Sequence, residues 1–131
     1  MMLLFAHGTA DGMSVLYILD HRNGDNMFDY DEAERVIQMA KEKLAPELMI
    51  VFGSVANRTA NEDSDLDLIL VKESDENGLI RSAKARLALK GSKVPIDIIV
   101  YTPEEFKLKL TNKYSLPFEA LATGKIVHGS V

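Results

Sequence analysis

Two aspartates that stand two positions apart are the first residues of this chain that could do chemistry together. Asp65 and Asp67 lie in a segment with strand character, so their carboxylates project from the same face. Two carboxylates about 4 Å apart repel by roughly 4 kcal/mol at an effective dielectric near 20. A divalent cation would offset this repulsion, and hard oxygen ligands suit Mg²⁺ or Mn²⁺. For the pair alone, a solvated strand end is the simpler interpretation.

A third aspartate, Asp97, stands among β-branched apolar residues in the segment 94–101. Burying a carboxylate without a partner is expensive. We therefore expect Asp97 to pair with a base or to join the same metal site. The alternative is a structural salt bridge.

A glycine–serine turn, Gly53 and Ser54, directly follows the apolar segment 48–52. Glycine allows the backbone to approach a ligand closely. If a helix begins at about residue 55, its free N–H groups could bind an anion, and the Ser54 hydroxyl adds a donor. The turn therefore suits a phosphate, although a plain loop is the more common meaning of such a dipeptide.

The elements that must position these residues follow from the spacing of apolar residues and from end signals. In 79–89, Leu79, Ile80, Ala83 and Leu87 fall on one side and predict an amphipathic helix that Gly91 ends. The other predicted helices are 29–45 before Pro46, 103–110 after a capping box, and 117–122 before Gly124. The predicted strands are 48–52, 65–71, 94–101 and, at an edge, 125–128. This order predicts an α/β or α+β domain with a small mixed β-sheet flanked by helices.

Composition narrows the class of protein. The chain has 131 residues, of which 47% are hydrophobic and 27% charged, as in one globular domain. Cysteine is absent, which excludes disulfides and thiolate metal sites and fits the cytoplasm. No apolar run approaches the roughly 18 residues of a membrane span, and the net charge of −5 argues against binding to nucleic acid.

The first 28 residues form a separate N-terminal extension in this interpretation. Two short apolar runs flank a turn-rich stretch there. This pattern is compatible with a β-hairpin or with an arm that packs on a neighbouring subunit, and the second option would make a homo-oligomer. Residues 29–131 are expected to form the domain that carries the site.

Taken together, these residues spell Gly-Ser-x10-Asp-x-Asp with a third aspartate on a later strand. The pattern resembles the minimal nucleotidyltransferases, the smallest members of the DNA polymerase β-like superfamily. The resemblance runs from about residue 29 to 128 and is carried by 52–56, 63–68 and 94–99. Where that family often has Ala-Arg-Gly after the turn, this chain has Ala-Asn-Arg, which ends at Arg58. The resemblance implies a nucleotidyltransferase fold.

The resemblance also implies a reaction, namely transfer of a nucleoside monophosphate from a triphosphate, with AMP from ATP as the expectation. Gly53 and Ser54 would hold the phosphates, with Arg58 as a further contact. The three aspartates would hold two Mg²⁺ ions, and Asp97 could accept the proton of the attacking hydroxyl.

Minimal nucleotidyltransferases resemble the antitoxin half of toxin–antitoxin modules whose other half is a helical HEPN protein. Only 34 residues follow Asp97, too few for a further acceptor-binding domain, so we expect the acceptor hydroxyl on such a partner. Two alternatives remain open. One is a catalytically idle antitoxin that masks its partner by contact, and the other is a small-molecule nucleotidyltransferase.

Overall fold

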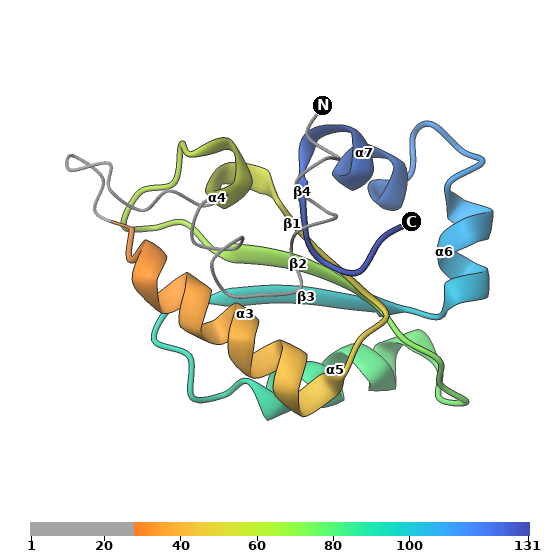
Figure 1. The fold of residues 1–131 in the computed structure, drawn as a ribbon, viewed down its shortest axis with the longest axis horizontal. Helices are drawn as coiled ribbons and strands as arrows, with labels where there is room; N and C mark the ends of the chain where they lie inside the picture. The colour runs from red at the N-terminus through yellow and green to blue at the C-terminus, as the bar shows by residue number, and fades with distance from the viewer. Residues whose placement is uncertain (1–27) are drawn as a thin grey trace.

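The computed structural model describes residues 28–131, and they form a four-stranded mixed sheet with helices on both faces (Figure 1). The sheet order is β3-β2-β1-β4. Strand β1 is antiparallel to β2 and β4, whereas β2 and β3 are parallel. The strands are β1 (Leu48–Phe52), β2 (Leu66–Val71), β3 (Ile96–Tyr101) and β4 (Lys125–His128). The predicted mixed sheet and its edge strand at 125–128 are confirmed. The hairpin or arm expected in residues 1–28 falls, apart from Phe28, outside the described residues.

The helices divide between the two faces of the sheet. Helices α3 (Tyr30–Leu44) and α5 (Gly78–Ala88) cover one face, and α6 (Pro103–Lys109) and α7 (Leu116–Thr123) cover the other. The short α4 (Gly53–Asn57) stands at the end of β1, as Figure 1 shows.

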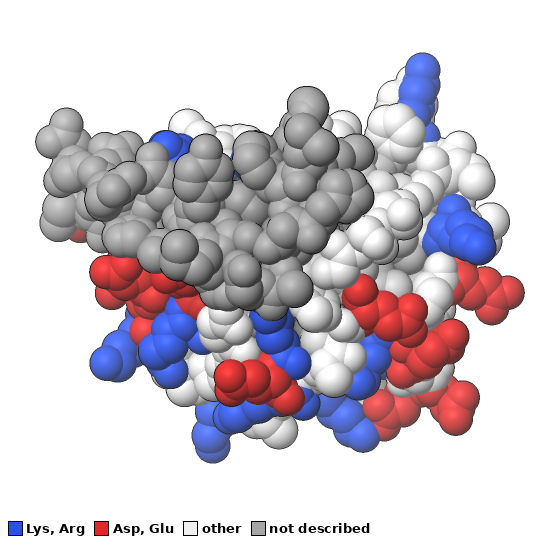
Figure 2. Space-filling view, viewed as in Figure 1, with Lys and Arg blue, Asp and Glu red and all other residues white. Residues whose placement is uncertain are grey.

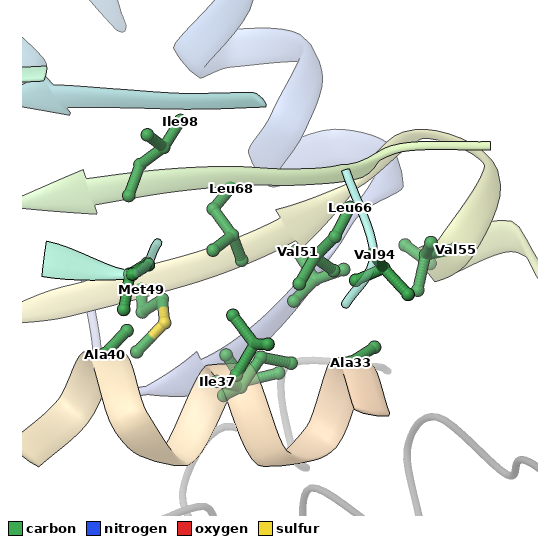
Figure 3. Packing of buried hydrophobic residues seen from close by; sticks show 14 of the residues in the cluster. Ala33, Ile37, Ala40, Met49, Val51, Val55, Leu66, Leu68, Val94 and Ile98 are labelled. Atoms are coloured by element: carbon green, nitrogen blue, oxygen red, sulfur yellow. The ribbon is translucent and has the colours of Figure 1, made fainter. Parts of the chain in front are cut away.

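Alternation along the strands builds a separate core on each face. On the first, Ile37 of α3 lies against Met49, Leu66 and Leu68, all fully buried (Figure 3). Leu66 and Leu68 therefore point into the core, as the strand pattern predicts. The second core joins the alternate strand residues to α6 and α7: Leu48, Ile50, Ile69, Val71, Phe106 and Ala120.

The helix ends follow the capping signals. The Asp29 side chain accepts the N–H of Glu32 at 3.0 Å and caps α3, which ends at Ala45 in the left-handed conformation, with a φ of 46°. The capping box at the start of α6 is present, since Thr102 and Glu105 each bond the other's backbone N–H. Helix α5 ends at Ala88 with Leu89 as its C-cap, close to the predicted end at residue 89 and before Gly91.

Helix α5 faces the sheet with a different side from the predicted one. Leu79 and Leu87, on the side expected to be buried, are 85% and 66% exposed, whereas Arg81 and Ala85 are buried. Arg81 can be buried because its guanidinium donates to the Val100 carbonyl at 3.2 Å and to the Glu76 carbonyl at 2.6 Å, and pairs with Glu105. The prediction failed because it counted only apolar residues, and an arginine whose polar groups are all hydrogen-bonded can also be buried.

A buried carboxylate, Glu32, ties α3 to the loop before β3. It is 7% exposed, and it accepts two bonds of 2.7 Å from Arg35 and one of 2.7 Å from the Lys93 N–H. These bonds, that of Arg35 first, outweigh the cost of burial and lower the pKa of Glu32 to about 2. The loop that leads to Asp97 is thus fixed to α3.

We predict that Glu32→Gln destabilises the protein by about 1–3 kcal/mol at pH 7, because it removes charge-assisted hydrogen bonds. The pKa of Glu32 is lowered on folding, so its contribution is present above pH 4.5 and is lost as the pH falls towards 2. Urea unfolding at pH 7 and pH 3 measures both effects. Glu42→Gln, an exposed change in the same helix, is the control. Equal unfolding free energies for E32Q and E42Q at pH 7 would contradict the prediction.

Candidate active site

The three predicted aspartates meet at the end of the sheet where β1 stops and β2 and β3 begin. Asp67 is the register partner of Asp97 across the parallel pair, and of Phe52 across the antiparallel pair. Neighbouring strands lie about 4.8 Å apart, so paired residues on one face are neighbours. Asp65 directly precedes β2.

Asp67 is the least exposed of the three carboxylates. Its pKa is raised to about 6, first by burial and then by the negative charges of Asp97 and Asp65. Within residues 28–131, no lysine, arginine or histidine forms an ion pair with any of these carboxylates. The cluster therefore holds several negative charges with no cation among the described side chains to balance them.

Gly53 is the residue that allows this carboxylate to sit where it does. Its φ is +72°, in the left-handed region that favours glycine, and a Cβ placed on it would lie 2.3 Å from Asp67 Oδ2. The ladder explains the closeness, because Phe52 lies opposite Asp67 and Gly53 is the next residue. Glycine is required here both for backbone conformation and for space.

The glycine–serine turn opens α4 two residues earlier than predicted. The helix begins at Gly53 itself, not at residue 55. Its C-cap is Arg58, whose φ of 64° lies in the left-handed region. The Ser54 carbonyl accepts the Thr59 N–H at 2.9 Å, which closes the turn. Ser54 and Arg58 both lie in the short segment that Gly53 begins beside Asp67. Ser54 is half-buried, and Arg58 is exposed.

The expected burial of Asp97 is wrong. Asp97 is exposed on the edge strand β3, while its neighbour Ile98 is fully buried on the other face. No base pairs with it among residues 28–131, so the salt-bridge alternative is also not realised there. Its local sequence is apolar because alternate residues face the core, not because the carboxylate is enclosed. The desolvation cost falls on Asp67 instead.

Gly124, predicted only as the end of a helix, also supports the end of β1 beside the site. A Cβ there would lie 2.6 Å from the carbonyl oxygens of Val51 and Ala120, and 3.1 Å from the Cβ of Phe52. This glycine lets the turn between α7 and β4 lie directly on the end of β1. The sequence shows that a glycine ends the helix, but only the strand order shows that this glycine contacts β1.

The donor set fits a hard divalent cation in its chemistry. Carboxylate oxygens are the ligands that Mg²⁺ prefers, and three carboxylates gather here. In their present positions they do not form a closed cage, since no group of three or more His, Asp or Glu in the described part of the chain is arranged to hold a metal ion by itself. This is compatible with Mg²⁺, which is commonly bound by one or two carboxylates together with substrate phosphates.

Comparison with known families now decides the class of protein. The model of the nucleotidyltransferase domain family matches residues 33–120, more than half of the chain and a span that contains the turn and all three aspartates. The chain belongs to the nucleotidyltransferase domain family. Its membership fits the DNA polymerase β-like superfamily, and it supports nucleotidyl transfer as the general activity of this transferase. No curated protein and no solved structure matches the chain. None of the helices in residues 28–131 is long and apolar enough to span a bilayer.

We predict that Gly53→Ala damages the site and costs about 1–3 kcal/mol of stability, because a side chain there meets Asp67 and requires a positive φ. Thermal unfolding measures the stability, and calorimetry measures binding of ATP with Mg²⁺, which should be lost. Gly91→Ala is the matched control, since a Cβ at Gly91 has no atom within 4 Å. Unchanged stability and nucleotide binding in G53A would contradict this account.

We predict that Asp67→Asn stabilises the metal-free protein at pH 8 by about 1–2 kcal/mol, a value reduced for solvent screening at a partly open site. The pKa of Asp67 is raised on folding to about 6. Its ionisation therefore opposes folding, and the penalty is absent below pH 4 and grows as the pH rises through 6.

Urea unfolding of D67N and wild type in a chelator, at pH 3 and pH 8, tests whether ionised Asp67 destabilises the fold. The difference should appear only at pH 8. Asp63→Asn, an exposed change in the loop before β2, should change stability at neither pH. A D67N protein that is less stable than wild type at pH 8 would contradict the prediction.

Proposed function

We propose that the chain is a Mg²⁺-dependent nucleotidyltransferase of the minimal type, which transfers AMP from ATP to a hydroxyl on a helical partner protein of the HEPN class. The observation that supports it most is the contact of Asp67 with Gly53, beside a glycine–serine turn and in a cluster of three carboxylates that pair with no base among residues 28–131. The use of ATP is consistent with the cytoplasm as its compartment.

In this proposal Asp65, Asp67 and Asp97 would hold two Mg²⁺ ions. When bound, such ions neutralise charge on the triphosphate and lower the pKa of an attacking hydroxyl. The raised pKa of Asp67 supports this assignment, because perturbed carboxylates gather at functional sites. The match to the nucleotidyltransferase domain covers all three residues.

The turn would bind the nucleotide. Gly53 has no side chain to block a phosphate, the Ser54 hydroxyl can donate to a phosphate oxygen, and the exposed Arg58 offers a guanidinium for a bidentate contact. Arg58 takes the left-handed backbone that closes α4. The backbone from which the Arg58 side chain extends is therefore held in place by the end of α4.

Asp97 would accept the proton of the attacking hydroxyl. The acceptor oxygen forms a bond to the α-phosphorus, the bond from that phosphorus to the β-phosphate bridge breaks, and pyrophosphate leaves. The proton of the hydroxyl passes to the Asp97 carboxylate, a group that can act as a general base. Because Asp97 is exposed on the edge strand β3, a hydroxyl on another molecule can approach it from solvent. This exposure supports an acceptor on a partner protein.

We predict that α-³²P-labelled ATP and Mg²⁺ transfer label to a purified HEPN protein encoded beside this chain, and that D65N/D67N abolishes the transfer. D97N should lower the rate by at least 100-fold, since a general base typically contributes about 10²–10⁴-fold. D63N is the control and should transfer at the wild-type rate.

Mass spectrometry of the partner should show one added AMP. If the partner is inhibited equally by wild type and D65N/D67N with no label on it, the chain is an idle antitoxin. Label that appears on a small hydroxyl compound instead of the partner would place the chain among small-molecule nucleotidyltransferases.

A further inference from the structure

Helix α5 presents an apolar stripe to solvent. Leu79, Ala83 and Leu87 are spaced four residues apart and all are exposed, Leu79 by 85% and Leu87 by 66%. Ile80, which is 44% exposed, widens the stripe on its N-terminal half. Residues with this spacing share one side of a helix. The other side of α5, with Arg81 and Ala85, already packs on the sheet. The stripe is thus an apolar surface that the fold of residues 28–131 does not use.

A groove continues the stripe towards β3. It has a volume of about 380 Å³, and Ala83 and Leu87 belong to both surfaces. The other residues that line the groove are Arg86, Leu89, Lys90, Ser92, Val94 and Ile96. An apolar side chain from another molecule could insert between α5 and the start of β3.

The charge of this surface is opposite to that of the chain. The groove is lined by two bases, Arg86 and Lys90, and by no carboxylate, although the whole chain has a net charge of −5. Both bases are exposed, and neither forms an ion pair within residues 28–131. In Figure 2, both Lys and Arg side chains and Asp and Glu side chains lie along the lower border of the view, where Figure 1 places α5, so the basic character belongs to the groove lining itself. An occupant with acidic side chains beside apolar ones is complementary to this surface.

Side-chain hydrogen bonds at the edge of β3 argue against an added strand. The Val100 N–H donates to Ser82 Oγ at 3.0 Å, and the Val100 carbonyl accepts from Arg81 Nε at 3.2 Å. Helix α5 thereby satisfies backbone groups that strand addition would need. The apolar stripe, with its four-residue spacing, instead matches the ridge of a second helix.

We propose that the exposed side of α5, with its adjoining groove, binds an amphipathic helix of another protein whose apolar stripe is flanked by Asp and Glu. A second copy of this chain is a poor occupant, because pairing the same surface would bring Arg86 and Lys90 against their counterparts. Nucleic acid is disfavoured because the apolar side chains here are aliphatic and provide no ring for base stacking.

The test uses two designed helical peptides with one leucine stripe, flanked by Glu in the first and by Lys in the second. Fluorescence anisotropy measures the affinity, and amide chemical shifts of the labelled full chain locate the bound peptide. We expect the Glu peptide to bind at least tenfold more tightly than the Lys peptide, with shifts confined to residues 79–96.

Matched variants separate this surface from other apolar residues. L79Q/L87Q should weaken binding of the Glu peptide at least tenfold, whereas Leu108→Gln, at a leucine of α6 that is 70% exposed, should not change it. R86Q/K90Q should remove the preference for Glu over Lys. Because the substituted residues are exposed, we expect the far-ultraviolet circular dichroism of all three proteins to match wild type.

The proposal is overturned by any of four results: no binding of the Glu peptide at millimolar concentration, equal binding of both peptides, shifts centred elsewhere, or tight binding of a single-stranded RNA to this surface. It is also overturned if sedimentation shows a dimer that L87Q dissociates. D65N/D67N should bind the Glu peptide as wild type does, so failure of AMP transfer and failure of this surface give different outcomes.

Discussion

The carboxylate of Asp67 lies against the backbone of Gly53, and the arrangement of the site depends on that contact. It exists because β1 and β2 pair in the register that sets Phe52 opposite Asp67. The parallel register of β2 and β3 then places Asp97 beside it. A slip of one residue would move Leu66 and Leu68 out of the core. The packing that holds the sheet together is therefore the same packing that gathers the carboxylates.

This arrangement has an electrostatic cost that the rest of the domain must offset. Burial and two neighbouring negative charges raise the pKa of Asp67, and no base among residues 28–131 pairs with the cluster. The two buried charged residues elsewhere in residues 28–131, Glu32 and Arg81, are each bonded to groups from other elements. The contrast with a carboxylate cluster that pairs with no base among residues 28–131 supports the proposal that a cation binds there.

Much of the fold could be predicted from the sequence because its signals are local. The strand at 48–52, the capping box at Thr102 and the edge strand at 125–128 each depend on a few adjacent residues, and the structure has them. The meeting of the aspartates followed from strand alternation combined with the glycine–serine turn. These signals act within one element or between two neighbours.

The parts that could not be predicted depend on topology. Asp97 is exposed because β3 lies at the edge of the sheet, a fact that no window around Asp97 contains. The side of α5 that faces the sheet was misassigned because Arg81 finds its partners on Glu76, Val100 and Glu105, which a hydrophobic pattern does not register. The close approach of Asp67 to Gly53 likewise depends on the β1–β2 register, which no single segment of the sequence contains.

The most direct test of the central claim is paramagnetic broadening of amide signals by Mn²⁺ in the labelled full chain with ATP present. The account predicts broadening centred on residues 53–58, 65–67 and 96–98 in the wild type, and its loss in the D65N/D67N/D97N variant. Broadening that centres elsewhere, or that persists unchanged in the triple variant, would contradict the assignment of these carboxylates to one cation site.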